Sequence, residues 1–142
     1  ERFGVNERAL IASLVRRHLK HAAGFELAPE GAPPPDGAEA DERRIGDYES
    51  ACPDGTRALV FTDRALYVDG TQRQRVPWSE VVDYELPASK RAVDGVRVLT
   101  TSGAVFVPMC GERGPTGKFK DAFDMIRLLK ALRDRRARER DR

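Results

Sequence analysis

Residues 57–132 constrain the fold most, because short apolar segments separated by tight turns give way there to one long amphipathic segment. Short segments rich in Val, Leu, Phe and Tyr and bounded by Gly, Pro or Asp are typical of antiparallel strands. A closing run with apolar residues every three or four positions is typical of a helix. Strands first and one helix last predict a mainly β, α+β domain, in which a partly open antiparallel barrel is capped by its C-terminal helix.

About seven strands are expected before that helix. Asp63-Arg64 and Asp69-Gly70 mark tight reversals, and Ser102-Gly103 marks the last hairpin. The expected strands are residues 45–52, as a first edge strand, and then 58–62, 65–68, 75–78, 82–86, 96–100 and 104–109. In the closing helix, expected over residues 119–132, one face collects Phe119, Ala122, Phe123, Ile126, Leu129 and Leu132. We expect that face to plug the barrel.

An amphipathic segment, residues 5–24, precedes the strands. Asn6 is a favourable N-cap and Gly24 is placed to end a helix, so the apolar periodicity between them predicts a helix over residues 7–23. The opposite face carries the cations Arg8, Arg16, Arg17 and Lys20. Either the apolar stripe packs on the domain and leaves the cations in solvent, or the helix lies on a partner protein or a membrane.

Residues 25–43 are interpreted as a linker to the main domain, residues 44–133. The segment contains Pro33, Pro34 and Pro35 in succession and is rich in Gly, Ala and acidic residues. Such a composition buries too little apolar surface to offset the entropy cost of ordering it. Residues 134–142 form a charged tail in which Arg alternates with Asp or Glu, a pattern that favours a solvated helical extension.

Charge is distributed unevenly along the chain, although the formal net charge is only +2. Residues 26–49 contain eight acidic residues and two arginines, whereas residues 133–142 contain six arginines and three acidic residues. The small total argues against a general attraction to nucleic acid. The tail also interleaves acids with its arginines and lacks aromatic residues for base stacking, so no nucleic-acid partner is expected.

Cys52 and Cys110 are the only cysteines, too few for a disulfide framework. We expect reduced, mostly buried thiols, with a single bridge or a redox pair as the alternatives, because no Cys-x-x-Cys spacing is present to activate a thiol. The sequence shows neither a signal-peptide pattern nor an apolar run of membrane-spanning length. These features favour a cytoplasmic location, with the inner face of the membrane as the alternative.

The segment 111–118, GERGPTGK, resembles a phosphate-binding loop but has the wrong spacing. Glu112 and Phe119 occupy the positions where a P-loop requires Gly and Ser or Thr. Lys118 and Lys120 beside a helix N-terminus leave a weaker hypothesis, the binding of a single anion. The only histidines, His18 and His21, lack the further ligands that zinc needs. We expect no catalytic residue, metal, cofactor or small-molecule substrate.

The segments ALVFTDRALYV at 58–68 and VPWSEV at 76–81, the Gly103 hairpin and the closing helix together resemble the bacterial pleckstrin-homology-like family. The resemblance covers residues 44–133. It implies a partly open barrel of seven strands plugged by a C-terminal helix, and implies a function only weakly. Lipid-binding members of that family hold phosphoinositide headgroups with a basic cluster between the first two strands. Residues 52–56 contain no cation, so headgroup recognition at that place is not expected.

Two functions from different classes follow from these patterns. The favoured one is a non-catalytic protein-interaction or scaffolding module, in which the exposed edge of the barrel or the first helix docks a partner protein or a second copy of the chain. The alternative is peripheral binding to an anionic membrane through Arg8, Arg16, Arg17 and Lys20 together with the arginine-rich tail. An enzymatic role is not expected.

Overall fold

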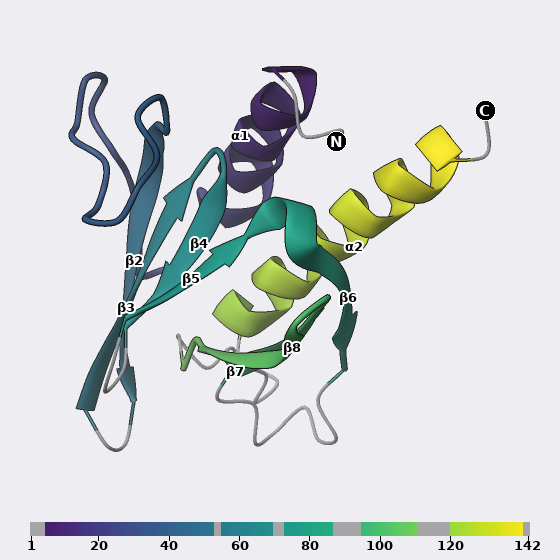
Figure 1. Cartoon of the computed structure of the whole chain (residues 1–142). Coiled ribbons are helices and arrows are strands. Elements are labelled where there is room, and N and C mark those ends of the chain that lie inside the picture. Colours follow the sequence, from purple (N-terminus) through teal and green to yellow (C-terminus); the bar gives the residue numbers. More distant parts are fainter. Residues whose placement is uncertain (1–4, 53–54, 70–72, 87–94, 111–119, 141–142) are drawn as a thin grey trace.

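The computed structural model describes residues 5–52, 55–69, 73–86, 95–110 and 120–140 (Figure 1). Its helices are α1 (Val5–Leu19) and α2 (Lys120–Arg140), and its strands are β1 (Phe25–Leu27), β2 (Arg44–Cys52), β3 (Gly55–Thr62), β4 (Ala65–Val68), β5 (Gln74–Pro77), β6 (Val81–Glu85), β7 (Gly95–Thr100) and β8 (Gly103–Pro108). Two antiparallel sheets form, in the orders β1-β2-β3-β4-β5 and β6-β7-β8. The expected α+β class with antiparallel strands is confirmed, but the described strands do not close into a barrel.

The two sheets meet at a sharp corner, the 3-10 turn η1 (Trp78–Glu80). The buried indole of Trp78 donates from Nε1 to the carbonyl oxygen of Thr62 at 2.8 Å, and its ring stacks on Phe61 at a centroid distance of 6.3 Å. Its backbone N–H donates to the carbonyl oxygen of Arg64 at 2.9 Å. These contacts hold the chain where β5 of one sheet ends and β6 of the other begins.

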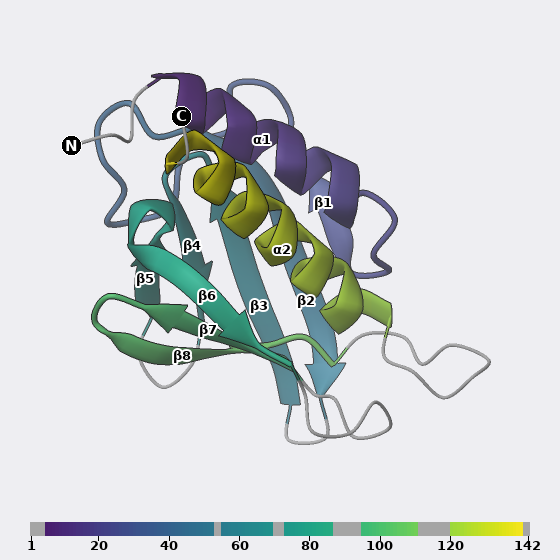
Figure 2. The same cartoon turned by 90° about the vertical axis from the view of Figure 1, so that its right-hand side faces the viewer.

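The helices α1 and α2 lie side by side (Figure 2) and run in opposite directions, because Lys120 contacts His21 at one end of the pair and Arg136 contacts Glu7 at the other. α2 also packs on β6 and β7, and α1 on β2. The core between helices and sheets includes Ile11, Val15, Leu19, Tyr48, Leu59, Phe61, Leu66, Val96, Val98, Val107, Met125, Leu128 and Leu132. The expected burial of the closing helix is therefore confirmed for Ile126 and Leu129, whereas Phe119 lies outside the described residues.

The strand β2 is not an edge strand, and that prediction is wrong. β1 pairs with one side of β2 and β3 pairs with the other. The Phe25 ring of β1 covers Gly46, where an added Cβ would come within 2.4 Å of the ring, and meets Phe61 edge-on at a centroid distance of 5.9 Å. Glycine at position 46 thus leaves room for the aromatic ring that attaches the short outer strand.

The first helix differs from its predicted limits at both ends. α1 begins at Val5, so Asn6 is inside the helix and not its N-cap, and it ends at Leu19, before the predicted residue 23. Gly24 lies beyond the helix and against β2, where an added Cβ would be 2.0 Å from the carbonyl oxygen of Glu49. The backbone N–H of Glu49 donates to the carbonyl oxygen of Gly24 at 3.1 Å. Gly24 therefore permits a close approach of two backbones.

The last helix is longer than expected, because α2 continues through most of the charged tail to Arg140. Arg136 attaches this part of the helix: its guanidinium donates to the carbonyl oxygens of Trp78 at 2.7 Å and Val81 at 2.6 Å, and pairs with Glu7 at 2.8 Å. One side chain thus connects the end of α2 with the corner between the sheets and with the beginning of α1.

Cys52 and Cys110 form a disulfide, so the expectation of reduced thiols is wrong. Their Cα atoms are 5.3 Å apart, within the range that a disulfide spans, because the end of β2 meets the second residue after β8. The buried Ser50 hydroxyl accepts the backbone N–H of Cys110 at 3.3 Å beside the bond.

Residues 28–43 form neither helix nor strand, but they fold back over the outer face of the larger sheet. Ala38 packs on Val60, Ala65 and Tyr67, which form a second apolar cluster separate from the main core. Glu42 is buried at the end of the segment. A composition typical of a linker thus follows a defined path, because polar contacts as well as apolar ones attach it.

Candidate functional site

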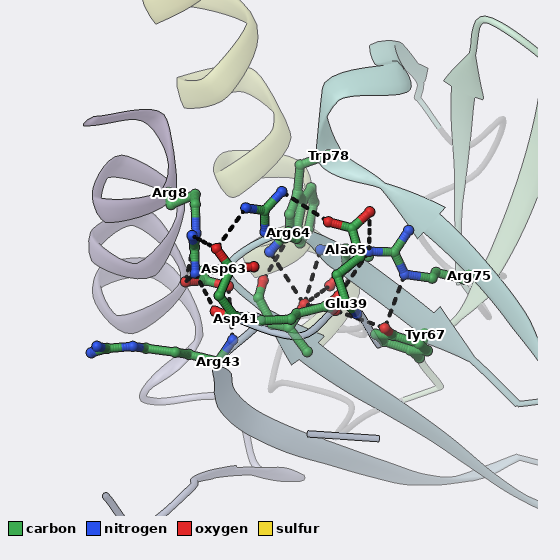
Figure 3. Close-up of polar contacts among 12 residues, drawn as sticks. Arg8, Glu39, Asp41, Arg43, Asp63, Arg64, Ala65, Tyr67, Arg75 and Trp78 are labelled. Atoms are coloured by element: carbon green, nitrogen blue, oxygen red, sulfur yellow. Dashed lines mark hydrogen bonds and ion pairs between the residues drawn. The ribbon is translucent and has the colours of Figure 1, made fainter. Parts of the chain in front are cut away.

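A dense group of polar contacts lies at one end of the larger sheet, where the 28–43 segment meets α1 and strands β3 to β5 (Figure 3). We call this group the charged cluster. It contains Arg8, Glu39, Asp41, Glu42, Asp63, Arg64, Tyr67 and Arg75. Three arginines from different elements therefore meet four carboxylates, three of which come from a short stretch of the supposed linker.

Glu42 is the buried centre of the charged cluster, and donors fill the acceptor positions of its carboxylate. One oxygen accepts the backbone N–H of Glu39 at 3.0 Å and an N–H of Arg75 at 2.8 Å. The other accepts the hydroxyls of Thr62 and Tyr67, the latter at 2.7 Å. A carboxylate has about four lone-pair sites, so this arrangement leaves Glu42 satisfied.

Glu42 remains ionised in its buried position because of these donors. Burial alone would raise the pKa of the Glu42 carboxyl, but the hydrogen bonds from Thr62, Tyr67, Glu39 and Arg75 together lower it below its ordinary value. Burial and the neighbouring carboxylate both raise the pKa of the Tyr67 hydroxyl. At neutral pH the protonated Tyr67 hydroxyl therefore donates a hydrogen bond to an ionised Glu42.

The outer part of the charged cluster attaches α1 to the sheet. Arg8 donates to the Asp63 carboxylate from Nη2 at 2.9 Å and from Nε at 3.1 Å, and also pairs with Asp41 at 2.9 Å. Arg64 reaches the same Asp41 at 3.0 Å, and its hydrogen bond, with a further one from Arg8, lowers the pKa of that carboxyl. Because these groups neutralise one another, the charged cluster fastens three segments together and offers no free carboxylate.

The cations predicted on the first helix divide into two sets. Arg8 is engaged in the charged cluster, so the structure does not leave it for a membrane or a partner. Arg16 and Arg17 on the solvent side of α1, and Lys20 directly after the helix, are exposed, and no ion pair engages them within the described residues. The apolar stripe of α1 is buried against α2 and the sheet, as in the first of the two interpretations.

Of the two lysines proposed to hold an anion, Lys118 lies outside the described residues. Lys120 begins α2, and its ammonium group donates to the carbonyl oxygen of His21 and pairs with Asp124, both at 3.0 Å. These contacts join the N-terminus of α2 to the end of α1. The single-anion hypothesis stays a prediction.

The two histidines lie near the end of α1, and they do not converge on a metal site. No group of three His, Cys, Asp or Glu side chains suited to a metal ion occurs among the residues that the structure describes. Burial, and after it the nearby cations Arg17 and Arg127, lower the pKa of His18, although Asp124 acts in the opposite direction. His18 is therefore in a locally positive environment between the two helices.

The smaller sheet presents the most exposed apolar side chains. Phe106 on β8 is 49% exposed, Val82 on β6 is 54% exposed and Leu86, which follows β6, is 70% exposed. Phe106 lies opposite Arg97, which in turn lies opposite Glu85, so the three share the outer face of the sheet. Sequence analysis placed β8 correctly but gave no reason to single out Phe106.

Comparisons with family models, with curated proteins and with solved structures found no match to this chain. Among the described residues, neither helix combines the length and the apolar character needed to cross a bilayer. The resemblance to the pleckstrin-homology-like family therefore stays a prediction.

Proposed function

We propose that this chain is a non-catalytic protein-interaction or scaffolding module, and that its docking surface is the outer edge of β8 with the adjoining face of the smaller sheet. The observation that carries the proposal is the distribution of exposed apolar residues. Three of the four large apolar side chains exposed by the described residues, Val82, Leu86 and Phe106, belong to this sheet or its end. Val82 and Leu86 belong to β6 or its end and Phe106 to β8, the two outer strands of this sheet, and exposed apolar residues gathered on one sheet mark interaction surfaces more often than scattered ones.

The strand β8 has the properties of an edge that another strand can extend. It pairs with β7 over six residues in a regular register and carries no charged side chain. Within the described residues no strand pairs with its other side. Edge strands that must remain single are usually protected by Lys or Pro residues, by bulges or by short length. Of these protections, β8 has only the terminal Pro108.

The proposed occupant is an extended segment of a partner protein. Only an extended chain can satisfy the row of backbone N–H and C=O groups along a strand edge, and alternate side chains of that segment would contact the ring of Phe106. The first helix no longer competes for this role, because the apolar residues Ile11, Leu14, Val15 and Leu19 are buried in the chain's own core.

The pleckstrin-homology-like resemblance belongs to the same proposal. Seven strands in the expected order followed by a helix packed on β6 and β7 support it. The additional β1 and α1, the disulfide and the division into two sheets are departures from the implied barrel. Assignment to the pleckstrin-homology-like fold predicts that function depends on surface features and not on a catalytic centre.

A peptide library tests the docking surface directly. Peptides selected on the immobilised chain from a phage-displayed random library are titrated into the isotopically labelled protein, and amide shifts are followed by NMR. We expect the largest shifts in β8, and loss of binding in Phe106→Lys. Leu27→Lys is the matched control, because Leu27 is an equally exposed apolar residue, 50% against 49%, on β1.

A second variant separates docking from stability, since Phe106 also covers Gly95. Ala104→Lys places a charge on the exposed side of β8 without removing that ring, and it should weaken peptide binding while the unfolding midpoint is unchanged. Shifts confined to the helices, or equal loss in the Leu27 control, would contradict the proposal. Self-association that Ala104→Lys abolishes in light scattering over a dilution series would identify a second copy, and not a partner segment, as the occupant.

A further inference from the structure

A second surface, which is basic where the first is apolar, is formed by the solvent sides of the two helices. We call it the basic helix face and define it by Arg16 and Arg17 of α1, Lys20 directly after α1, and Lys120, Arg127 and Lys130 of α2. All six side chains are exposed. They come from the two ends of the sequence and share a surface because α1 and α2 pack side by side along their lengths (Figure 2).

The net charge of the two helical regions is more positive than the net charge of the whole chain. Residues 7–20 and 120–139 together contain eleven Lys and Arg residues and five Asp and Glu residues, whereas the complete chain has 25 and 23. The remainder is therefore net negative. The small overall net charge therefore does not reveal that positive charge is concentrated on the helices and negative charge on the rest of the chain.

The cations of the basic helix face are only partly neutralised. In the α1 region, no ion pair engages Arg16, Arg17 or Lys20 within the described residues, as noted above. On α2, Lys120 and Arg127 share the single carboxylate of Asp124, at 3.0 and 2.8 Å, and Lys130 pairs with Asp134 at 2.8 Å. Cations from both helices also act together on His18, whose pKa is lowered by burial and then by Arg17 and Arg127. The positive potential is thus shared across the contact between the helices.

The shape of this surface favours a planar anionic partner. With a rise of about 1.5 Å per residue, α1 and α2 extend for about 22 and 31 Å. Two packed helices form a broad face, whereas a nucleic-acid groove admits a single helix or a narrow ribbon. The large exposed apolar residues lie on β1 and the smaller sheet, not on these helices, so the contact would be electrostatic and without deep insertion.

We infer that the basic helix face binds the surface of an anionic lipid bilayer. This surface replaces the set of residues first suggested by the sequence: Arg8 is withdrawn into the charged cluster, and Lys120, Arg127 and Lys130 are added. The proposed orientation places the helices against the headgroups and leaves β8 accessible. Lipid binding and partner docking therefore use different surfaces and fail independently.

Vesicle cosedimentation tests the inference with the complete chain. Vesicles of phosphatidylcholine alone are compared with vesicles that also contain phosphatidylserine, at low and at physiological ionic strength. We expect binding only to the anionic vesicles, and weaker binding as salt screens the charges. The triple variant Arg17→Glu, Lys20→Glu and Arg127→Glu should reduce the apparent affinity on the order of a hundredfold, because each basic residue near the surface contributes separately.

The matched control reverses the same number of charges elsewhere. The control is Arg43→Glu, Arg73→Glu and Arg97→Glu. These three arginines are also exposed, but they lie on the 28–43 segment, directly before β5 and on β7. This control should keep most of the affinity. Should the helix variant fail to fold, Arg16→Gln with Lys20→Gln removes two cations that form no ion pair within the described residues, and should still weaken binding.

Three outcomes would overturn the inference. One is absence of binding by the native chain to anionic vesicles at low salt. Another is an equal loss in the helix variant and the matched control, which would make net charge alone responsible. The third is binding to a fluorescent oligonucleotide but not to the vesicles, with loss in the helix variant, which would assign the basic helix face to nucleic acid.

Discussion

The two sheets of this chain differ in how completely they are covered. The larger sheet has its inner face on the helices, through Tyr48, Leu59 and Phe61, and its outer face under the 28–43 segment, through Val60 and Tyr67. The smaller sheet has one covered face, whose buried residues are Val96, Val98 and Val107, and an outer face that exposes Arg97 and Phe106.

This difference separates the part of the chain that stabilises the fold from the part that is available for binding. Polar contacts follow the same division: the buried carboxylate of Glu42 attaches the 28–43 segment to the larger sheet through Arg75, whereas the pair between Arg97 and Glu85 on the smaller sheet is solvent-exposed at both ends. Exposed pairs contribute little to stability, while removing one member of a buried group costs much more. The larger sheet should therefore unfold last.

The disulfide is expected to give the largest effect, because it cross-links the end of β2 in the larger sheet to the chain just after β8 in the smaller sheet. Replacing both Cys52 and Cys110 with Ser opens a loop with a sequence separation of 58. The free energy of unfolding should fall by about 4 kcal/mol, as the chain-entropy relation gives for such a loop. Urea unfolding measures the loss, and hydrogen exchange should accelerate more in β8 than in β3.

The reductant provides the control for this prediction. Dithiothreitol should destabilise the native chain by a similar amount and leave the double Ser variant unaffected. A native chain whose urea midpoint does not respond to reductant would show that the two thiols are unpaired, as the sequence alone suggested. Equal acceleration of exchange in both sheets would remove the distinction between them.

Removing the buried carboxylate is expected to give the next largest effect. Glu42→Ala leaves the hydroxyls of Thr62 and Tyr67 and the guanidinium of Arg75 without their acceptor. We expect a loss of about 3 kcal/mol in the free energy of unfolding, because buried donors would be unsatisfied. The larger sheet would lose the attachment of its outer cover.

Glu49→Ala is the control, since Glu49 is an exposed glutamate on β2 of the same sheet. A surface substitution of this kind should change stability by no more than about 0.5 kcal/mol. Limited proteolysis gives a second readout, with cleavage within residues 28–43 appearing in Glu42→Ala and not in the control. Similar losses in the two variants would show that Glu42 does not hold the segment.

Much of the strand and helix pattern could be predicted because its signals are local. Turn residues such as Asp63 and Gly103 and the apolar runs between them located β3 to β8, and the apolar periodicity located both helices. The strand β1 could not be predicted in the same way. Three residues carry no periodicity, and the pairing of β1 depends on the Phe25 ring over Gly46.

The charged cluster could not be predicted because its contacts are distant in sequence. Glu42 lies in a Pro-rich and acidic stretch, and its partners Thr62, Tyr67 and Arg75 are 20, 25 and 33 positions away. One sequence signal did point to a cover over this sheet. Residues 65–68, ALYV, are an unbroken apolar run, which is typical of a strand packed on both faces, and all four residues are buried in β4. The disulfide likewise depends on where β2 and β8 end in space.

Two aromatic rings that cover glycines allow a matched comparison of the sheets. Phe25 on β1 covers Gly46 and also contacts Phe61, whereas the half-exposed Phe106 on β8 covers Gly95. Phe25→Ala should reduce the free energy of unfolding by about 2 kcal/mol and Phe106→Ala by about 1 kcal/mol, because only Phe25 also packs against the core. Urea unfolding measures both, and a larger loss for Phe106 would reverse the assignment of the two sheets.

The smallest effect concerns pH, and it too distinguishes the covered sheet. Because the folded-state pKa of Glu42 is lowered, its contribution to stability is present above the unfolded value of about 4.5 and is lost as the pH falls below it through the folded value. Glu42→Gln removes this charge without shortening the side chain. Its deficit in unfolding free energy relative to the native chain should therefore be greatest at neutral pH and narrow in acid. A deficit that stayed constant across the acid range would mean that the Glu42 side chain is not an ionised acceptor, and that shape alone attaches residues 28–43 to the larger sheet.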